Sequence, residues 1–158
     1  MTMTYQIATA DLQEQQVACM HSRILPGELR AFLTAAYSRV PAATAQQGLG
    51  LDGPPYARYR FEKDGTIDVE AGFPVRGVIA PTGDVAPGTL PGGHVVSTLH
   101  VGAYDQVAGA YDALETYLSK NGYEQAGAAW ECYLDEPDVP EPRTKVYQPA
   151  RRLSRRPT

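Results

Sequence analysis

A short pattern that occurs twice in the chain constrains its fold more than any other feature. The segments Gly53 to Tyr59 and Gly127 to Tyr133 share the order Gly-x-x-aromatic-x-x-Tyr, and similar predicted elements surround both copies. The order strand, helix, strand, strand is therefore expected twice. Two such modules form one antiparallel sheet with both helices on one face, which leaves a central groove for a ligand. We predict an α+β fold with halves at about 4–78 and 84–149.

In the first half, strands are predicted from alternating polar and apolar residues, and a helix is predicted from apolar residues at helical spacing. A helix is predicted over 27–39, and Pro41 is expected to interrupt it because proline lacks a backbone donor and clashes with the preceding turn. A Gly/Pro-rich connection is expected from 80 to 93. The strands predicted for this half are 5–12, 16–24, 56–62 and 66–75.

The second half repeats this order. Residues 94–101 are rich in β-branched side chains and predict a strand. Apolar residues at spacings of four, three and four predict an amphipathic helix over 105–120. The remaining predicted strands are 128–134 and 144–148.

Size and composition indicate one soluble domain over residues 1–150. The chain has 158 residues, 43% of them hydrophobic, and a net charge of −4, which weighs against nucleic acid as a direct partner. Residues 151–158 read as a basic, disordered tail. No signal peptide or membrane span is recognisable, so we expect a cytoplasmic protein that acts as a monomer or dimer, with Cys19 and Cys132 as reduced packing groups.

Glu131 is the candidate functional acid, because the two halves differ at its position. Side chains alternate across a strand, so Glu131 and Tyr133 share one face, and Trp130 and Cys132 share the other. The matching first-half residues are Ala57 and Tyr59, so both halves keep the tyrosine but only one carries the acid. A repeat that serves folding alone does not need a central carboxylate in one half. The alternative is a strand glutamate that faces solvent or pairs with Arg58.

Aromatic residues gather near the repeated segments and suit flat or cationic organic ligands. A buried Glu131 could anchor a cation or transfer a proton, in the second case with Tyr104 or Tyr133 as partner. The alternative is that the rings are core residues with bonded hydroxyls. The predicted ligand contacts are Glu131, Tyr133, Trp130, Tyr104, Tyr59, Tyr56 and Phe73.

Other kinds of site lack a recognisable pattern. His21, His94 and His100 are far apart in sequence and have no metal-ligand spacing. No phosphate-binding Gly-rich motif is present, and we expect neither a metal nor a cofactor.

Several segments together resemble the GyrI-like small-molecule-binding domains, which are also the effector-binding domains of bacterial multidrug-responsive transcription activators. The resemblance runs from about Thr4 to Pro149. Its main segments are Leu90-Pro91-Gly92-Gly93, His100-Val101-Gly102-Ala103-Tyr104-Asp105, Trp130-Glu131-Cys132-Tyr133 and Pro55-Tyr56-Ala57-Arg58-Tyr59.

The resemblance implies pseudo-twofold symmetry, a ligand groove between the modules, and contact of Glu131 with cationic ligands. It leaves three functions open. The leading hypothesis is a stand-alone binding protein for hydrophobic, aromatic or cationic molecules. The second is a self-resistance hydrolase that opens the cyclopropane ring of DNA-alkylating natural products, with Glu131 and Tyr104 as catalytic residues. The third is a gyrase-inhibitor-like interaction protein that uses the acidic loop 135–141.

Overall fold

The computed structural model describes residues 4–136 and 138–153, and the chain divides into two compact units. The N-half unit is Gln13–Gly92, and the C-half unit is Met1–Leu12 together with Gly93–Thr158. Each unit contains one α-helix and antiparallel strands, as the sequence predicted.

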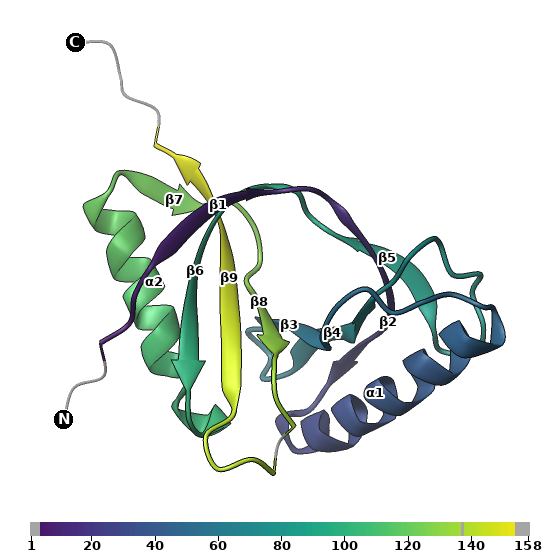
Figure 1. Cartoon of the computed structure of the whole chain (residues 1–158). Coiled ribbons are helices and arrows are strands. Elements are labelled where there is room, and N and C mark those ends of the chain that lie inside the picture. Colours follow the sequence, from purple (N-terminus) through teal and green to yellow (C-terminus); the bar gives the residue numbers. More distant parts are fainter. Residues whose placement is uncertain (1–3, 137, 154–158) are drawn as a thin grey trace. The chain divides into compact units, whose positions relative to one another are not determined.

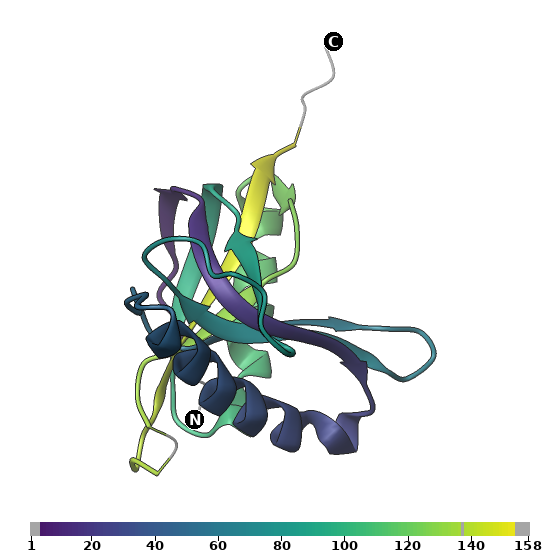
Figure 2. The ribbon, with the colours of Figure 1, turned by 90° about the vertical axis from the view of Figure 1, so that its right-hand side faces the viewer.

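The N-half unit is a four-stranded sheet in the order β3-β4-β2-β5. Helix α1 (Leu29–Gln46) follows the short 3-10 turn Pro26–Glu28 and contacts β2 and β4. Figure 2 shows the β3–β4 hairpin projecting away from α1. The strands are β2 (Gln15–Ile24), β3 (Tyr56–Phe61), β4 (Ile67–Pro74) and β5 (Ala86–Leu90).

The C-half unit has the strand order β8-β9-β6-β1, and the short β7 pairs with the end of β9. Helix α2 (Ala108–Lys120) follows the 3-10 turn Tyr104–Gln106 and lies along β6 and β9 (Figure 1). The strands are β1 (Ala8–Leu12), β6 (Gly93–Val101), β7 (Tyr123–Gln125), β8 (Trp130–Tyr133) and β9 (Arg143–Arg152).

The strand registers confirm the internal repeat. Tyr56 on β3 is opposite Gly72 on β4, and Trp130 on β8 is opposite Tyr147 on β9. Within each unit, the strand before the helix pairs with the last strand of the repeat. Ala57 and Glu131 are therefore equivalent positions, as the sequence predicted.

The prediction that Pro41 interrupts the first helix is wrong, because α1 continues through it to Gln46. An internal proline costs about 3 kcal/mol. Three residues around and beyond it, Val40, Ala43 and Thr44, are buried, and the Thr44 hydroxyl donates a hydrogen bond to the Pro41 carbonyl. Burial of this last part of the helix offsets the loss of one backbone hydrogen bond.

Strand β5 lies inside the segment 80–93, for which we predicted only a connection. It pairs with β2 alone, and the open side of an edge strand tolerates Pro87. Strand β7 was also missed, and β9 is longer than predicted because it continues through Arg151 and Arg152. Residues 154–158 of the predicted tail lie outside the described residues.

The core of the C-half unit lies between α2 and one face of its sheet, which we call the α2 face. Ala110, Leu114 and Leu118 of α2 pack against Val96 and Val146 of the strands. No helix in residues 4–136 and 138–153 is long and apolar enough to cross a membrane.

Candidate functional site

Glu131 lies near the middle of β8 with only 7% of its surface exposed. Its partner across the β8–β9 pair is Val146, which belongs to the core beneath α2. Directly opposed residues of an antiparallel pair share a face. The carboxylate therefore lies on the α2 face, and the alternatives of a solvent-facing glutamate or a pair with Arg58 do not hold.

Two tyrosines hold the Glu131 carboxylate from different elements. The Tyr111 hydroxyl of α2 donates a hydrogen bond of 2.6 Å to Oε2, and the Tyr133 hydroxyl of β8 donates one of 3.0 Å to Oε1. Tyr133 reaches the acid because residues two apart on a strand share a face. Each carboxylate oxygen thus has one hydroxyl donor.

Burial raises the pKa of Glu131 above its ordinary value of 4.5, because desolvation disfavours the charged form. The hydrogen bonds from Tyr111 and Tyr133, and the nearby His100, act in the opposite direction but only offset part of this effect. Among the described residues, no lysine or arginine forms an ion pair with Glu131. When it is ionised, the buried carboxylate therefore has no lysine or arginine as counter-ion in this part of the chain, and a bound cation could fill that role.

Tyr104 and His100 extend this cluster at the start of α2. The Tyr104 ring meets the Tyr133 ring edge-on, with centroids 5.7 Å apart. His100 is fully buried, and its Nε2 lies 2.8 Å from the Ala103 carbonyl, which can only accept a hydrogen bond. In neutral His100, Nε2 therefore carries the proton, and Nδ1 accepts from the Tyr5 hydroxyl at 2.8 Å. Two side chains thus fix the turn that carries Tyr104.

Trp130 does not join this cluster, because it lies on the opposite face of β8. Its ring stacks on Tyr147 with centroids 5.3 Å apart, and only 3% of the residue is exposed. The Lys145 ammonium lies over the Tyr147 ring, 5.2 Å from its centroid. Trp130 is thus buried in a stacked pair, apart from the Glu131 carboxylate.

The predicted contacts of the N-half unit also divide between two faces. Tyr56 is fully buried and donates a hydrogen bond of 2.5 Å to Glu70, whose carboxylate also pairs with Arg58 at 3.1 Å. Tyr59 and Phe73 lie on the other face, because β3 and β4 alternate, and the Phe73 ring meets Tyr37 of α1 edge-on. Tyr56 is thus separated from Tyr59 and Phe73 within its own sheet.

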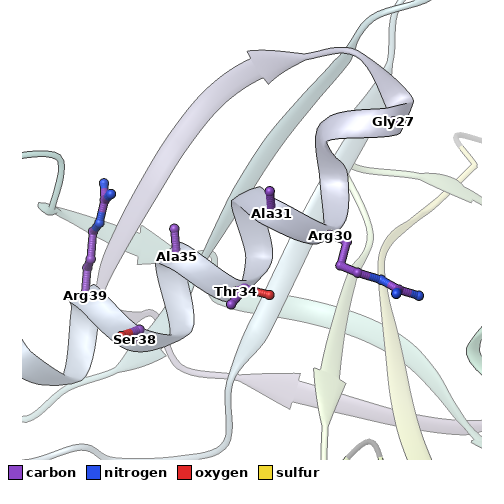
Figure 3. A pocket seen from close by; sticks show the side chains of 7 residues that line it. All are labelled: Gly27, Arg30, Ala31, Thr34, Ala35, Ser38 and Arg39. Carbon is purple, nitrogen blue, oxygen red and sulfur yellow. The ribbon is translucent and has the colours of Figure 1, made fainter.

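A surface hollow of about 680 Å³ runs along the exposed face of α1 (Figure 3). Small side chains of the helix and two arginines, Arg30 and Arg39, line it. Among the described residues, no group of three or more His, Cys, Asp or Glu side chains could hold a metal ion. The lining residues are Gly27, Arg30, Ala31, Thr34, Ala35, Ser38 and Arg39.

The family model of the GyrI-like small molecule binding domain matches residues 4–151, nearly the whole chain. The chain belongs to the GyrI-like family. No curated protein sequence matches it.

Solved structures show the same fold as this GyrI-like chain at low sequence identity. The crystal structure of the EcmrR C-terminal domain has a TM-score of 0.82 and 22% identity, covering 96% of this chain and 100% of that one. In the EcmrR–DNA complex the TM-score is 0.79 at 21% identity; the match covers 94% of this chain, which spans only 58% of the EcmrR chain.

Two further matches are more distant. A hydrolase from Listeria innocua has a TM-score of 0.63 and 11% identity, covering 92% of both chains. SAV2435, solved bound to tetraphenylphosphonium, has a TM-score of 0.59 and 12% identity, covering 94% of both chains.

Tyr111 is the residue of this GyrI-like site that sequence reasoning did not select. Its place on the apolar side of α2, three residues before Leu114, suggested a core ring. The hydrogen bond to Glu131 depends on where the helix meets β8, which spacing alone does not give. A tyrosine rather than phenylalanine on the buried side of a helix is the one sequence signal, because a buried hydroxyl needs a partner.

Proposed function

We propose that this GyrI-like domain, over residues 1–150, is cytoplasmic and binds hydrophobic, aromatic or cationic small molecules, with Glu131 as the acid of its site. The observation that carries the proposal is a buried carboxylate that two tyrosine hydroxyls hold, with no lysine or arginine paired to it among the described residues.

The contrast between Glu131 and Glu70 supports this function. Both carboxylates accept a tyrosine hydrogen bond, but Glu70 also has Arg58 at 3.1 Å. A buried charge is costly unless an opposite charge lies beside it. Glu70 therefore has its counter-ion within the fold, whereas we propose that the ligand supplies the one for Glu131.

The neighbouring rings favour an aromatic cation over a small inorganic one. Tyr104 and Tyr133 meet edge-on next to the carboxylate, and a cation over a tyrosine face gains about 0.5–2 kcal/mol. We propose Glu131, Tyr133, Tyr104 and Tyr111 as the contacts of the C-half unit, and Tyr59 and Phe73 as contacts of the N-half unit. Trp130 and Tyr56, which lie on the opposite faces of their strands, stay predicted contacts. The fold is shared with SAV2435, which binds tetraphenylphosphonium, so this cation is a suitable probe.

The test is calorimetric titration of the protein with tetraphenylphosphonium. We expect saturable binding that Glu131→Gln weakens at least about tenfold, since it removes the charge and keeps the shape. Glu115→Gln is the matched control, because Glu115 is an exposed acid on α2 and its loss should leave the affinity unchanged. Absence of binding by the wild type, or equal affinity of Glu131→Gln, would sink the proposal.

A second candidate is a hydrolase that opens a cyclopropane ring, and one feature favours it. A carboxylate whose pKa is raised by burial is a stronger base than an ordinary one, and two tyrosines fix its orientation. Glu131 would take a proton from water as the water oxygen bonds to one carbon of the strained ring, with Tyr104 or Tyr133 orienting the reactants. The ring C–C bond at that carbon would break, its electron pair would pass to the rest of the compound, and the proton held by Glu131 would finally be transferred there. Incubation with a cyclopropane-bearing alkylator should then add the mass of one water, and Glu131→Gln should abolish this gain. Unchanged compound would remove this candidate.

A further inference from the structure

Thr144 on β9 has a buried hydroxyl for which the described part of the chain offers no hydrogen-bond partner. The residue is completely buried, and its Oγ1 atom has no hydrogen-bond partner among the described residues. Buried polar groups in native proteins are nearly always bonded, so each exception calls for an explanation. A valine of almost the same shape would avoid the cost, which makes the threonine hydroxyl itself the feature to explain.

The strand registers locate Thr144 between two hydrogen-bonded groups. It is opposite Tyr133 on β8 and opposite His100 on β6, so the three side chains form one row on the α2 face. On the β8 side, Tyr133 and Tyr111 bond to Glu131. On the β6 side, His100 bonds to Tyr5 and to the Ala103 carbonyl.

The neighbouring acid and histidine have hydrogen-bond partners other than Thr144. Each Glu131 oxygen accepts one tyrosine hydroxyl, and both His100 nitrogens are engaged. The Thr144 hydroxyl, which can both donate and accept, therefore stands in the middle of this row with its capacity unused.

We propose that Thr144 Oγ1 is a specificity contact of the ligand site and hydrogen-bonds to a polar oxygen or nitrogen of the bound molecule. This deepens, and rests on, the proposed binding of aromatic cations at Glu131. The preferred ligand then carries a hydroxyl, carbonyl or amine in addition to its charge and rings. The Tyr133 and Tyr104 rings are half-buried and meet edge-on, and the proposal requires them to move for a ligand to reach the buried Thr144.

Two probes that differ by one hydroxyl test this contact: tetraphenylphosphonium and para-hydroxyphenyl triphenylphosphonium. The wild type should bind the hydroxylated probe about 3- to 10-fold more tightly, as one hydrogen bond provides. Thr144→Val, which keeps the shape and removes the hydroxyl, should bind both probes equally. Thr144→Ser should retain the preference, and Thr144→Ala replaces Thr144→Val in the comparison if the valine variant does not fold.

Thr98→Val is the matched control. Thr98 is also buried on the α2 face, but its hydroxyl already donates to the Gln6 carbonyl at 2.7 Å. This variant should keep the preference for the hydroxylated probe. The proposal is overturned if the wild type shows no preference, if Thr144→Val keeps it or weakens both probes equally, or if Thr98→Val also loses it. Failure of tetraphenylphosphonium itself to bind would instead reject the proposed function.

Discussion

Tyr111 of α2 and Glu131 of β8, 20 residues apart in the chain, are joined by a hydrogen bond of 2.6 Å. This bond ties the first turns of the helix to the acid of the sheet. In the N-half unit the equivalent strand position is Ala57, which has no polar group to hold. The two units share a topology, but only in the C-half unit does a helix side chain bond to a carboxylate at this strand position.

Replacement of Tyr111 by phenylalanine should move the titration of Glu131 to higher pH. The Tyr111 hydrogen bond stabilises the charged carboxylate and lowers its pKa, so its loss leaves desolvation less opposed. We expect the midpoint of the pH dependence of tetraphenylphosphonium affinity to rise. The protein should also lose about 1–2 kcal/mol of unfolding free energy, measured with urea.

Tyr117→Phe makes the same chemical change on the same helix and serves as the control. Tyr117 packs against the core beneath α2, and in the described residues only Tyr111 and Tyr133 donate to Glu131. Its removal should leave the pH midpoint where it is. An equal shift in both variants would contradict a specific role of the Tyr111 hydroxyl.

The raised pKa of Glu131 also predicts how stability changes with pH. A carboxyl whose pKa is higher in the folded state keeps its proton longer there than in the unfolded chain. Its contribution is thus complete below its ordinary value of 4.5 and is lost as pH rises through the raised value. Relative to Glu131→Gln, the wild type should lose unfolding free energy as pH rises above about 4.5 and through the raised pKa. A difference that stays constant over this range would show that burial does not shift the group.

Alternation and repetition carried most of the fold prediction. The Gly-x-x-aromatic-x-x-Tyr segments lead into β3 and β8, and alternation along β8 correctly put Glu131 beside Tyr133 and away from Trp130. These features depend on local periodicity, which a single sequence displays. The predicted end of the first helix was wrong, because burial of the residues after Pro41 outweighs the free-energy cost of a proline inside the helix.

Contacts between distant elements were not predictable in the same way. Cys19-Met20-His21 and Thr98-Leu99-His100 look alike in sequence, but the registers align His21 with Leu99, so the two histidines are not equivalent. His21 is exposed beside Asp68, whereas His100 is buried beneath Tyr5. The surroundings of Tyr111 and Thr144 depend on the strand register and on the position of the helix, and no local sequence pattern predicts either.

Both cysteines should react slowly with alkylating reagents in the folded protein. Burial raises the pKa of Cys19 and of Cys132 to about 11, so little thiolate exists near neutral pH. Iodoacetamide at neutral pH should leave most of the native protein unmodified over a time in which urea-unfolded protein gains two adducts, as measured by mass spectrometry. Rapid single labelling of native Cys132, which is partly exposed, would contradict this expectation.

Transfer of the acid to the other half of the repeat tests why Glu131 is tolerated. Ala57 is fully buried at the equivalent position, and Ala57→Glu would put a carboxylate there. Tyr59 corresponds to Tyr133, and at the same sequence offset Tyr37 of α1 corresponds to Tyr111, but the Tyr37 hydroxyl already donates to the Tyr56 carbonyl at 2.9 Å. The new carboxylate would have to compete for this helix donor, so we expect a loss of several kcal/mol in unfolding free energy.

Ala57→Gln separates charge from size, because glutamine fills the same volume without ionising. Both variants should lose stability through overpacking, by about 1–3 kcal/mol. The additional loss in Ala57→Glu should be small near pH 4 and should grow as pH rises, since ionisation of an unpaired buried carboxyl opposes folding. Urea unfolding of the two variants across this pH range measures the difference. Equal stabilities at every pH would mean that the N-half position accepts a charge as readily as the position of Glu131, and that the Tyr111 hydroxyl is not what makes the acid tolerable in the C-half unit.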